Sequence, residues 1–170
     1  MMSKNRLLSL DPSTSCTGWA VFHDGKLLEA GSIKADPKCS RWERQKYIAD
    51  QLLLMLENQY PYFEIDNNSS LGYTVVSEEP MVQGRNGLAL HKFLGAIEVL
   101  FSIPVNYVHP STVKRIMGSG KLDKFEVALA AGRLLKTDQE QEKMAKLISN
   151  EDFDATDAVA IGLCWMEMSK

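Results

Sequence analysis

The sequence has 170 residues, of which 45% are hydrophobic and 24% charged, which suits one compact domain with a sizeable core and excludes a disordered chain. Its formal net charge of −3 excludes a basic coat over the whole surface but not a local basic face. The three cysteines are widely spaced without a Cys-x-x-Cys pair, which argues against a zinc site or a disulfide framework.

These features predict the cellular setting. Scattered thiols are typical of a reducing compartment. The apolar run near the N-terminus is too short for a signal peptide, and no later run reaches membrane-spanning length. We expect a single domain over residues 1–170, located in the cytoplasm, with no membrane partner.

The N-terminal third is predicted to form three antiparallel strands. Apolar runs at 7–10 and 19–22 flank a turn of small and hydroxyl residues, and a third run follows at 27–33. Asp24-Gly25 between the second and third runs is a strong hairpin signal.

Helices and strands alternate in the rest of the chain. Apolar spacing predicts helices at 40–58 and 88–101, a polar loop at 64–72, and strands at 73–76 and 105–108. Pro80 prevents the strand at 73–76 from continuing as a central strand. A short helix capped by Ser111 or Thr112 and running through Met117 comes next, followed by helices at 124–135, 139–149 and 154–168. The fold class is therefore α/β, with a mixed sheet covered by helices on both faces.

Four acidic residues stand at the ends of predicted elements. Asp11 ends the first strand and Glu78 follows the strand at 73–76. Asp154 and Asp157 begin the last helix and share one face. Taken singly, each residue has a simpler interpretation. Asp11 would be a turn residue at a strand end, Asp154 would cap the last helix, and Glu79 would be a solvated neighbour of Glu78. If the four carboxylates lie together, their repulsion destabilises the fold unless cations neutralise it. Carboxylate oxygens are good ligands for Mg²⁺ or Mn²⁺. The set predicts two divalent ions about 4 Å apart, an arrangement used for displacement at phosphorus.

Four segments resemble, in the same order, the motifs of the RuvC Holliday-junction resolvases: LSLDPSTSCTGWAVF, VVSEEPM, HPSTVKRIMGSGKLDKFEV and DATDAVAIGL. The resemblance covers nearly the whole chain, and its brevity and loose match between motifs are similar to the bacteriophage branch. It implies an RNase H-like fold with a mixed five-stranded sheet. It also implies a site that holds two Mg²⁺ ions, for which Mn²⁺ can substitute. The implied ligands are Asp11, Glu78, Asp154 and Asp157. Glu79 would replace Glu78 if the family's motif were aligned one residue later.

A basic segment follows the strand at 105–108. Glycines lie between its cations, where they let backbone amides approach a phosphate closely. The resemblance places Lys114 and Lys124 near the scissile phosphate, whereas without it ordinary solvated lysines are the simpler interpretation. The candidate DNA-binding cations are Lys114, Arg115, Lys121 and Lys124. His109 could assist proton transfer, but a strand-end histidine bonded to backbone is the simpler interpretation.

One position departs from the family pattern. Members often have an aromatic residue three positions after the catalytic glutamate, where it stacks on or wedges between bases, and Met81 stands there in this sequence. Methionine fills space adaptably but stacks less well than an aromatic ring. We therefore expect Met81 to contact DNA and to relax the selectivity for four-way junctions, so that forks and flaps are also cut.

The resemblance implies the activity of a crossover junction endodeoxyribonuclease. Such an enzyme resolves Holliday junctions by paired symmetric nicks that leave 5′-phosphate and 3′-hydroxyl ends. Lys114 and Lys124 would neutralise charge on the transition-state phosphate. The apolar helix at 88–101 is either buried between the sheet and its neighbours or, as the resemblance implies, the interface of a homodimer with two sites for two strands. Such an enzyme of phage origin would act in the host cytoplasm.

Two other functions fit parts of the sequence. A phosphotransferase of the actin and sugar-kinase type also opens with an acidic hairpin followed by Ser and Thr, but it needs two lobes and a second glycine-rich phosphate loop, and 170 residues are too few. A module that grips branched DNA without cutting would not need four carboxylates. Nucleotide binding would reveal the first alternative, and metal-dependent nicking would exclude the second.

Overall fold

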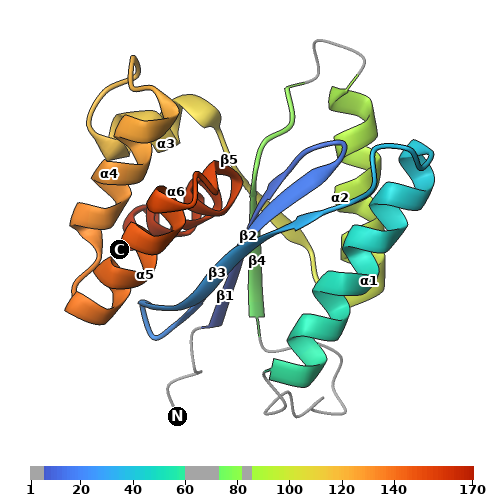
Figure 1. The fold of residues 1–170 in the computed structure, drawn as a ribbon, viewed down its shortest axis with the longest axis horizontal. Coiled ribbons are helices and arrows are strands. Elements are labelled where there is room, and N and C mark those ends of the chain that lie inside the picture. Colours follow the sequence, from blue (N-terminus) through green and yellow to red (C-terminus); the bar gives the residue numbers. More distant parts are fainter. Residues whose placement is uncertain (1–5, 60–72, 82–85) are drawn as a thin grey trace.

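Figure 1 shows the computed structural model, which describes residues 6–59, 73–81 and 86–170. Its strands are β1 (Arg6–Pro12), β2 (Cys16–His23), β3 (Lys26–Lys34), β4 (Tyr73–Glu78) and β5 (Val105–Val108). Its helices are α1 (Arg41–Gln59), α2 (Gly87–Phe101), α3 (Pro110–Met117), α4 (Lys124–Leu134), α5 (Asp138–Ser149) and α6 (Phe153–Met168). The predicted order is confirmed, with small shifts at element ends, and the loop predicted at 64–72 lies outside the described residues.

The strands form one mixed sheet in the order β3-β2-β1-β4-β5. β1 is antiparallel to β2 and β2 to β3, whereas β1, β4 and β5 are parallel. The hairpin predicted at Asp24-Gly25 is confirmed, because both residues have the positive φ values, 50° and 76°, that such a turn needs. β1, β4 and β5 therefore end at the same edge of the sheet.

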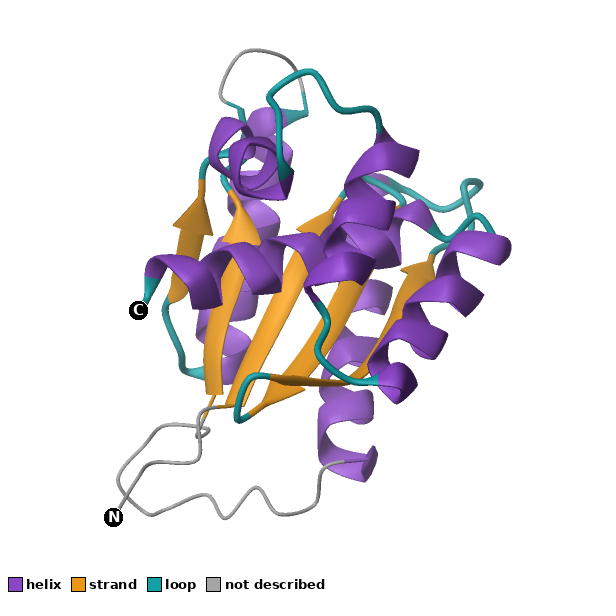
Figure 2. Cartoon of the chain, turned by 90° about the vertical axis from the view of Figure 1, so that its left-hand side faces the viewer, coloured by secondary structure: helices purple, strands orange, loops and turns teal. Residues whose placement is uncertain are grey.

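Helices cover both faces of the sheet, as the sequence predicted (Figure 2). Alternate residues of a strand point to opposite faces. Ala20 and Phe22 of β2 therefore join the core formed with α3, α4, α5 and α6, whereas Trp19 and Val21 join the core formed with α1 and α2. Among the described helices, none has the length and apolar character that crossing a membrane requires.

Two helix caps differ from the sequence-based expectation. His109 caps α3 by accepting a hydrogen bond at Nδ1 from the Ser111 backbone N–H (3.2 Å), so the predicted cap at Ser111 or Thr112 is wrong. The physical reason is Pro110, whose fixed φ and missing N–H suit the first position of a helix. Asp152, not Asp154, caps α6 by accepting from the Ala155 N–H (3.4 Å). The Asp154 carboxylate is therefore not engaged in capping α6.

Helix α5 covers part of the edge strand β3 through hydrogen bonds, one of which is buried. One oxygen of the buried Glu140 carboxylate accepts from the Leu27 N–H (2.7 Å), and the other accepts from the Thr137 hydroxyl (2.7 Å). Lys143 donates to the Leu27 and Leu28 carbonyl oxygens. Burial raises the pKa of Glu140, but these hydrogen bonds outweigh burial, and the net pKa lies below its ordinary value.

Glu140→Ala is therefore expected to lower the free energy of unfolding by about 1 to 3 kcal/mol, because it leaves the buried Leu27 N–H without an acceptor and also removes the partner of the exposed Thr137 hydroxyl. Because the pKa is lower in the folded protein, the carboxylate stabilises the fold above the ordinary glutamate pKa, and this stabilisation is lost as the pH falls through the folded value. Urea unfolding at several pH values measures the difference. The exposed Glu142→Ala serves as the control and should change stability by less than about 0.5 kcal/mol.

Candidate active site

The ends of β1 and β4 bring two carboxylates side by side. The strands are parallel neighbours, and Leu10 pairs with Ser77 at the last matched position. The next residue of each strand is Asp11 and Glu78. Both carboxylates are half-buried, and no donor among the described residues is recorded within hydrogen-bond distance of either. Glu79, in contrast, is exposed. The geometry thus favours Glu78 over Glu79 as the member of the site.

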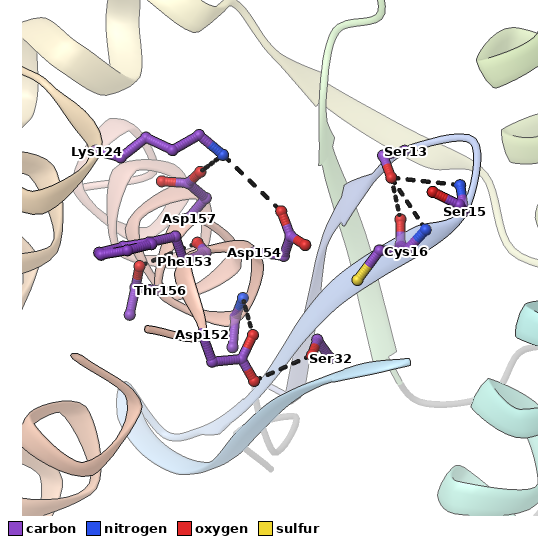
Figure 3. Close-up of polar contacts among 11 residues, drawn as sticks. Ser13, Ser15, Cys16, Ser32, Lys124, Asp152, Phe153, Asp154, Thr156 and Asp157 are labelled. Atoms are coloured by element: carbon purple, nitrogen blue, oxygen red, sulfur yellow. Dashed lines mark hydrogen bonds and ion pairs between the residues drawn. The ribbon is translucent and has the colours of Figure 1, made fainter. Parts of the chain in front are cut away.

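The start of α6 lies directly against β2, beside Asp11. Asp11 pairs with Gly18 in the β1–β2 register. A Cβ atom on Gly18 would lie only 1.8 Å from the backbone carbonyl oxygen of Asp154, so only glycine permits this contact. Asp152 fixes the helix end further, because its Oδ2 accepts from the Ser32 hydroxyl of β3 (3.0 Å) (Figure 3). These contacts place Asp154 and Asp157 next to the ends of β1 and β4.

Helix α6 is also held along its length. The Ser9 hydroxyl of β1 donates to the Ala158 carbonyl oxygen (2.7 Å) within the core. At Gly162, an added Cβ would lie 2.3 Å from the Phe22 ring and 2.8 Å from the Ser9 hydroxyl oxygen. Close packing of this kind leaves little freedom for the helix to shift against the sheet. The spacing between the strand-end and helical carboxylates is therefore set by the core.

Lys124, the first residue of α4, reaches both helical carboxylates. Its ammonium nitrogen lies 3.2 Å from Oδ2 of Asp157 and 3.9 Å from Oδ1 of Asp154 (Figure 3). Partial burial lowers the pKa of Lys124, but the neighbouring carboxylates outweigh burial and raise the pKa above its ordinary value. Lys124 is therefore a firmly charged cation among acids, and it is the only described residue that forms an ion pair with either aspartate.

Burial and mutual repulsion perturb the carboxyl groups. Burial raises the pKa of Asp11 well above its usual range, and repulsion from three carboxylates adds to the rise; these are Asp157, Glu78 and Asp154. Burial also raises the pKa of Glu78 and of Asp157, while Lys114 and Lys124 partly oppose both rises. The folded chain thus holds more negative charge here than its own cations neutralise, which is the condition that a bound cation would relieve.

Three of the four predicted carboxylates open onto a cavity of about 420 Å³, whereas Asp154 lies outside its lining. The lining contains the acidic residues Asp11, Glu78, Asp123 and Asp157, the lysines Lys114 and Lys124, and apolar residues of α3, α4, α6 and the connection before α4. Of the remaining predicted residues, Lys121 and Met81 are exposed and lie outside its lining, and Met81 exposes 58% of its surface. Arg115 is also outside it, and its charge partly opposes the burial that raises the pKa of the Cys164 thiol to about 11. The structure therefore does not group Arg115 with the carboxylates.

The donor set suits a divalent cation, although the described residues do not enclose one. Among residues 6–59, 73–81 and 86–170, no three Asp, Glu, His or Cys side chains already converge closely enough to bind a metal ion. The ammonium group of Lys124 lies between two of the carboxylates instead. Asp11 and Glu78 nevertheless present carboxylate oxygens for which no described residue supplies a hydrogen-bond donor, and carboxylate oxygens are the ligands that Mg²⁺ prefers.

Sequence reasoning missed one neighbour of the site. Figure 3 shows Asp154 between Lys124 and Cys16. Burial of the Cys16 thiol, together with its hydrogen bond to the Asp154 carboxylate, raises the pKa of Cys16 to about 12. Cys16 begins β2 and so lies at the carboxylate edge of the sheet, and this strand position was the available signal. Its high pKa makes the thiol a poor nucleophile.

Comparison with known proteins places the chain in a family. No family model matches the sequence. The crossover junction endodeoxyribonuclease RuvC of Zymomonas mobilis is 30% identical over 137 residues, which cover 75% of this chain and 76% of that protein. This chain belongs to the RuvC family. The RuvC proteins of Chloroherpeton thalassium (29% identical; 92% of this chain, 79% of that protein) and Ehrlichia chaffeensis (24%; 94% of each) are also similar.

Solved RuvC structures share the fold. Thermus thermophilus RuvC, solved in complex with a Holliday junction substrate, superposes with a TM-score of 0.64 at 20% identity and covers 97% of this chain and 96% of its own. A second structure of Thermus thermophilus RuvC gives a TM-score of 0.60 at 19% identity, covering 94% and 91%. The predicted RNase H-like fold with a five-stranded mixed sheet is thereby confirmed.

Proposed function

We propose that this protein is a Mg²⁺-dependent endodeoxyribonuclease that resolves four-way DNA junctions, with residues 1–170 acting as one nuclease domain. The observation that carries the proposal is the cavity in which Asp11, Glu78 and Asp157 meet Lys114 and Lys124, in a chain of the RuvC family. Acidic groups suit cations and basic groups suit phosphate, so one cavity offers both halves of a phosphodiester-cleaving site.

The carboxylates divide into two pairs with one proposed purpose. Asp11 and Glu78 come from the sheet, and Asp154 and Asp157 come from α6. They would hold two Mg²⁺ ions, with Mn²⁺ as a substitute; bound divalent ions lower the pKa of an attacking water and stabilise a leaving oxygen. In the described structure the Lys124 ammonium group pairs with Asp154 and Asp157. A bound cation would take its place beside these carboxylates, and the ammonium group could then contact the phosphate.

The lysines would act on the phosphate. Lys114 and Lys124 both line the cavity, and both lower the pKa of Glu78 and of Asp157 electrostatically, so their charge reaches the site. Positive groups held in place around a phosphate stabilise the extra charge of its transition state. Lys121 and Arg115, which lie outside the cavity, would contact more distant phosphates. The proposed products are nicks with 5′-phosphate and 3′-hydroxyl ends.

Helix α2 supports a homodimer. Phe93, Leu94, Ile97 and Phe101 are buried against the sheet. The outward side of this helix exposes large apolar residues, with Leu88 exposing 63% and Val99 81% of their surfaces, and the exposed Lys92 lies between them. Exposed apolar residues gathered on one side of a helix are typical of protein interfaces. We propose that two copies pair through the helix at 88–101, which would present two sites to the two symmetric strands of a junction.

A cleavage assay tests the function and its selectivity together. With Mg²⁺, a labelled static four-way junction should be nicked in two symmetric strands, and DNA ligase should reseal the nicks. Because the exposed Met81 replaces an aromatic ring, a fork should be cut as well, at a rate within about tenfold of the junction, since stacking on one base contributes roughly 1–3 kcal/mol. Binding without nicking would leave only a DNA-binding module, and complete inactivity on the fork would refute the relaxed selectivity.

Membership of the bacteriophage branch remains a prediction. The relatives described above are bacterial RuvC proteins. The proposal for a structure-specific nuclease does not depend on which branch is correct, because the site residues belong to motifs of the family as a whole. A cytoplasmic location, where both bacterial and phage DNA are found, is proposed with it.

A further inference from the structure

A second group of positive side chains lies in the segment that connects β3 to α1. Its cations are Lys34, the last residue of β3, Lys38 in the connection, and Arg41, the first residue of α1. All three are exposed, and no ion pair to any of them is recorded among the described residues. Next to them Trp42 exposes 68% of its surface, more than any other described aromatic side chain. In a chain of net charge −3, such a grouping is a distinct local feature.

The strand directions place this segment near the carboxylates. β1 and β3 are both antiparallel to β2, so they run in the same direction and end at the same edge of the sheet. Lys34 pairs with Cys16, whose thiol is hydrogen-bonded to Asp154. Figure 1 shows the connection into α1 beside the turn between β1 and β2, which is the turn that follows Asp11.

Hydrogen bonds hold the segment to that turn. The Ala35 N–H donates to the Ser15 carbonyl oxygen (2.9 Å). The Arg44 guanidinium donates to the Thr14 carbonyl oxygen (3.0 Å), and also to two carbonyl oxygens within the segment, those of Pro37 (3.2 Å) and Cys39 (2.7 Å). The segment is therefore positioned relative to the catalytic edge before any ligand binds, which reduces the entropy that binding would cost.

The first turn of α1 is ordered in its own right. The Ser40 N–H donates to the Glu43 carboxylate (2.8 Å), and the Glu43 N–H donates to the Ser40 hydroxyl (3.3 Å). This reciprocal pair fixes the helix start and with it the positions of Arg41 and Trp42. A cation in the first turn opposes the helix dipole, so helix stability does not explain Arg41. Nor does core packing explain Trp42, which is mostly in water.

We infer that this segment is a second DNA contact, in which Lys34, Lys38 and Arg41 bind backbone phosphates of a junction arm and Trp42 stacks on an unpaired base at the branch. The inference rests on the proposed function and extends it. Exposed cations next to an exposed aromatic ring are what a strand with unstacked bases requires. Figure 3 shows Lys124 on one side of Asp154 and the turn that holds this segment on the other. DNA would therefore be gripped on both sides of the carboxylates.

Binding to a fluorescent four-way junction, followed by anisotropy over a series of salt concentrations, tests the inference. An Asp11→Asn background with Mg²⁺ keeps the junction uncut. The double variant Lys38→Ala/Arg41→Ala should bind more weakly, and the slope of log K against log salt should fall by about 2, since each phosphate contact contributes roughly 0.9. Trp42→Ala should weaken binding about tenfold at constant slope, and Trp42→Phe should restore most of it. The control is Lys26→Ala, an exposed lysine that begins β3 at the opposite edge of the sheet, and it should behave as the parent.

The outcomes separate this inference from the proposed function. If the parent protein cuts and binds junctions but the segment variants keep its affinity and salt slope, the second contact is wrong and the nuclease proposal stands. If the unsubstituted protein neither cuts nor binds a junction, the proposed function fails and the inference with it. Sedimentation of Trp42→Ala supplies a further check: dissociation of a dimer would assign Trp42 to a subunit interface and overturn its stacking role.

Discussion

Asp11→Asn should reduce Mg²⁺-dependent cleavage of a four-way junction by about a thousandfold or more while leaving the fold intact. The side chain keeps its shape but loses the charge that Asp157, Glu78 and Asp154 all sense. Charge stabilisation by a bound divalent ion contributes several kcal/mol to a reaction at phosphorus, and each 1.36 kcal/mol is a factor of ten in rate. Single-turnover nicking of a labelled junction measures the loss.

The matched control is Glu79→Gln, whose exposed carboxylate lies one residue after Glu78. Its cleavage rate should stay within about threefold of the parent (roughly 0.6 kcal/mol). Normal cutting by Asp11→Asn would refute the proposed ligand set.

Asp11→Asn should lower the cleavage rate but should not lower the stability of the folded protein when no metal is present. A raised pKa means that the folded protein binds the proton more tightly than the unfolded chain. That contribution is therefore complete below the ordinary aspartate pKa and is lost as the pH rises through the raised value. At neutral pH in EDTA the parent carries this uncompensated repulsion, and Asp11→Asn relieves part of it. The melting temperature of the variant should equal or exceed that of the parent in EDTA, and Mg²⁺ should raise it less. A variant that melts well below the parent would show that Asp11 is mainly a structural residue.

The sequence predicted the strand-end carboxylates because their positions depend on local pattern. An apolar run that stops at Asp11, and a β-branched run that stops before Glu78, each mark a strand end. Parallel strands then bring those ends to one edge of the sheet, as the register of Leu10 with Ser77 shows. The pairing of Asp154 with Asp157 follows equally from helical spacing, and both lie within 4 Å of the Lys124 ammonium group.

The remaining features depend on contacts between distant elements, which no local pattern contains. Nothing near Cys16 in the sequence indicates that Asp154 will perturb the pKa of its thiol, and nothing near Arg115 indicates that its charge will act on Cys164. Lys114 and Arg115 are adjacent cations whose local pattern does not distinguish them, although the resemblance to the family favoured Lys114; in the structure only Lys114 lines the cavity. Neighbouring helix residues point about 100° apart, so which of the two faces the cavity is decided by how α3 packs on α6.

Gly18 is the clearest such contact, and Gly18→Ala is expected to damage both stability and activity. The added Cβ would lie 1.8 Å from the carbonyl oxygen and 2.2 Å from the carbonyl carbon of Asp154, and 2.9 Å from the Ala155 nitrogen. These are backbone atoms, so no side-chain rotation can relieve the clash, and the start of α6 must move away from β2. Overpacking of this kind costs about 1–3 kcal/mol, measurable by urea unfolding.

The displacement should also lower the cleavage rate of the protein that remains folded. Moving α6 shifts Asp154 and Asp157 relative to Asp11, and a misplacement of about 1 Å can lower a rate roughly a hundredfold. We therefore expect folded Gly18→Ala, assayed well below its melting temperature, to cut a junction about a hundredfold more slowly and to gain less stability from Mg²⁺ than the parent. Gly132→Ala is the control, because its Cβ would make only an ordinary contact, 3.4 Å from Cγ of Met144, and alanine favours the helix. Parental rates from Gly18→Ala would mean that the carboxylates do not need this close approach of helix and strand.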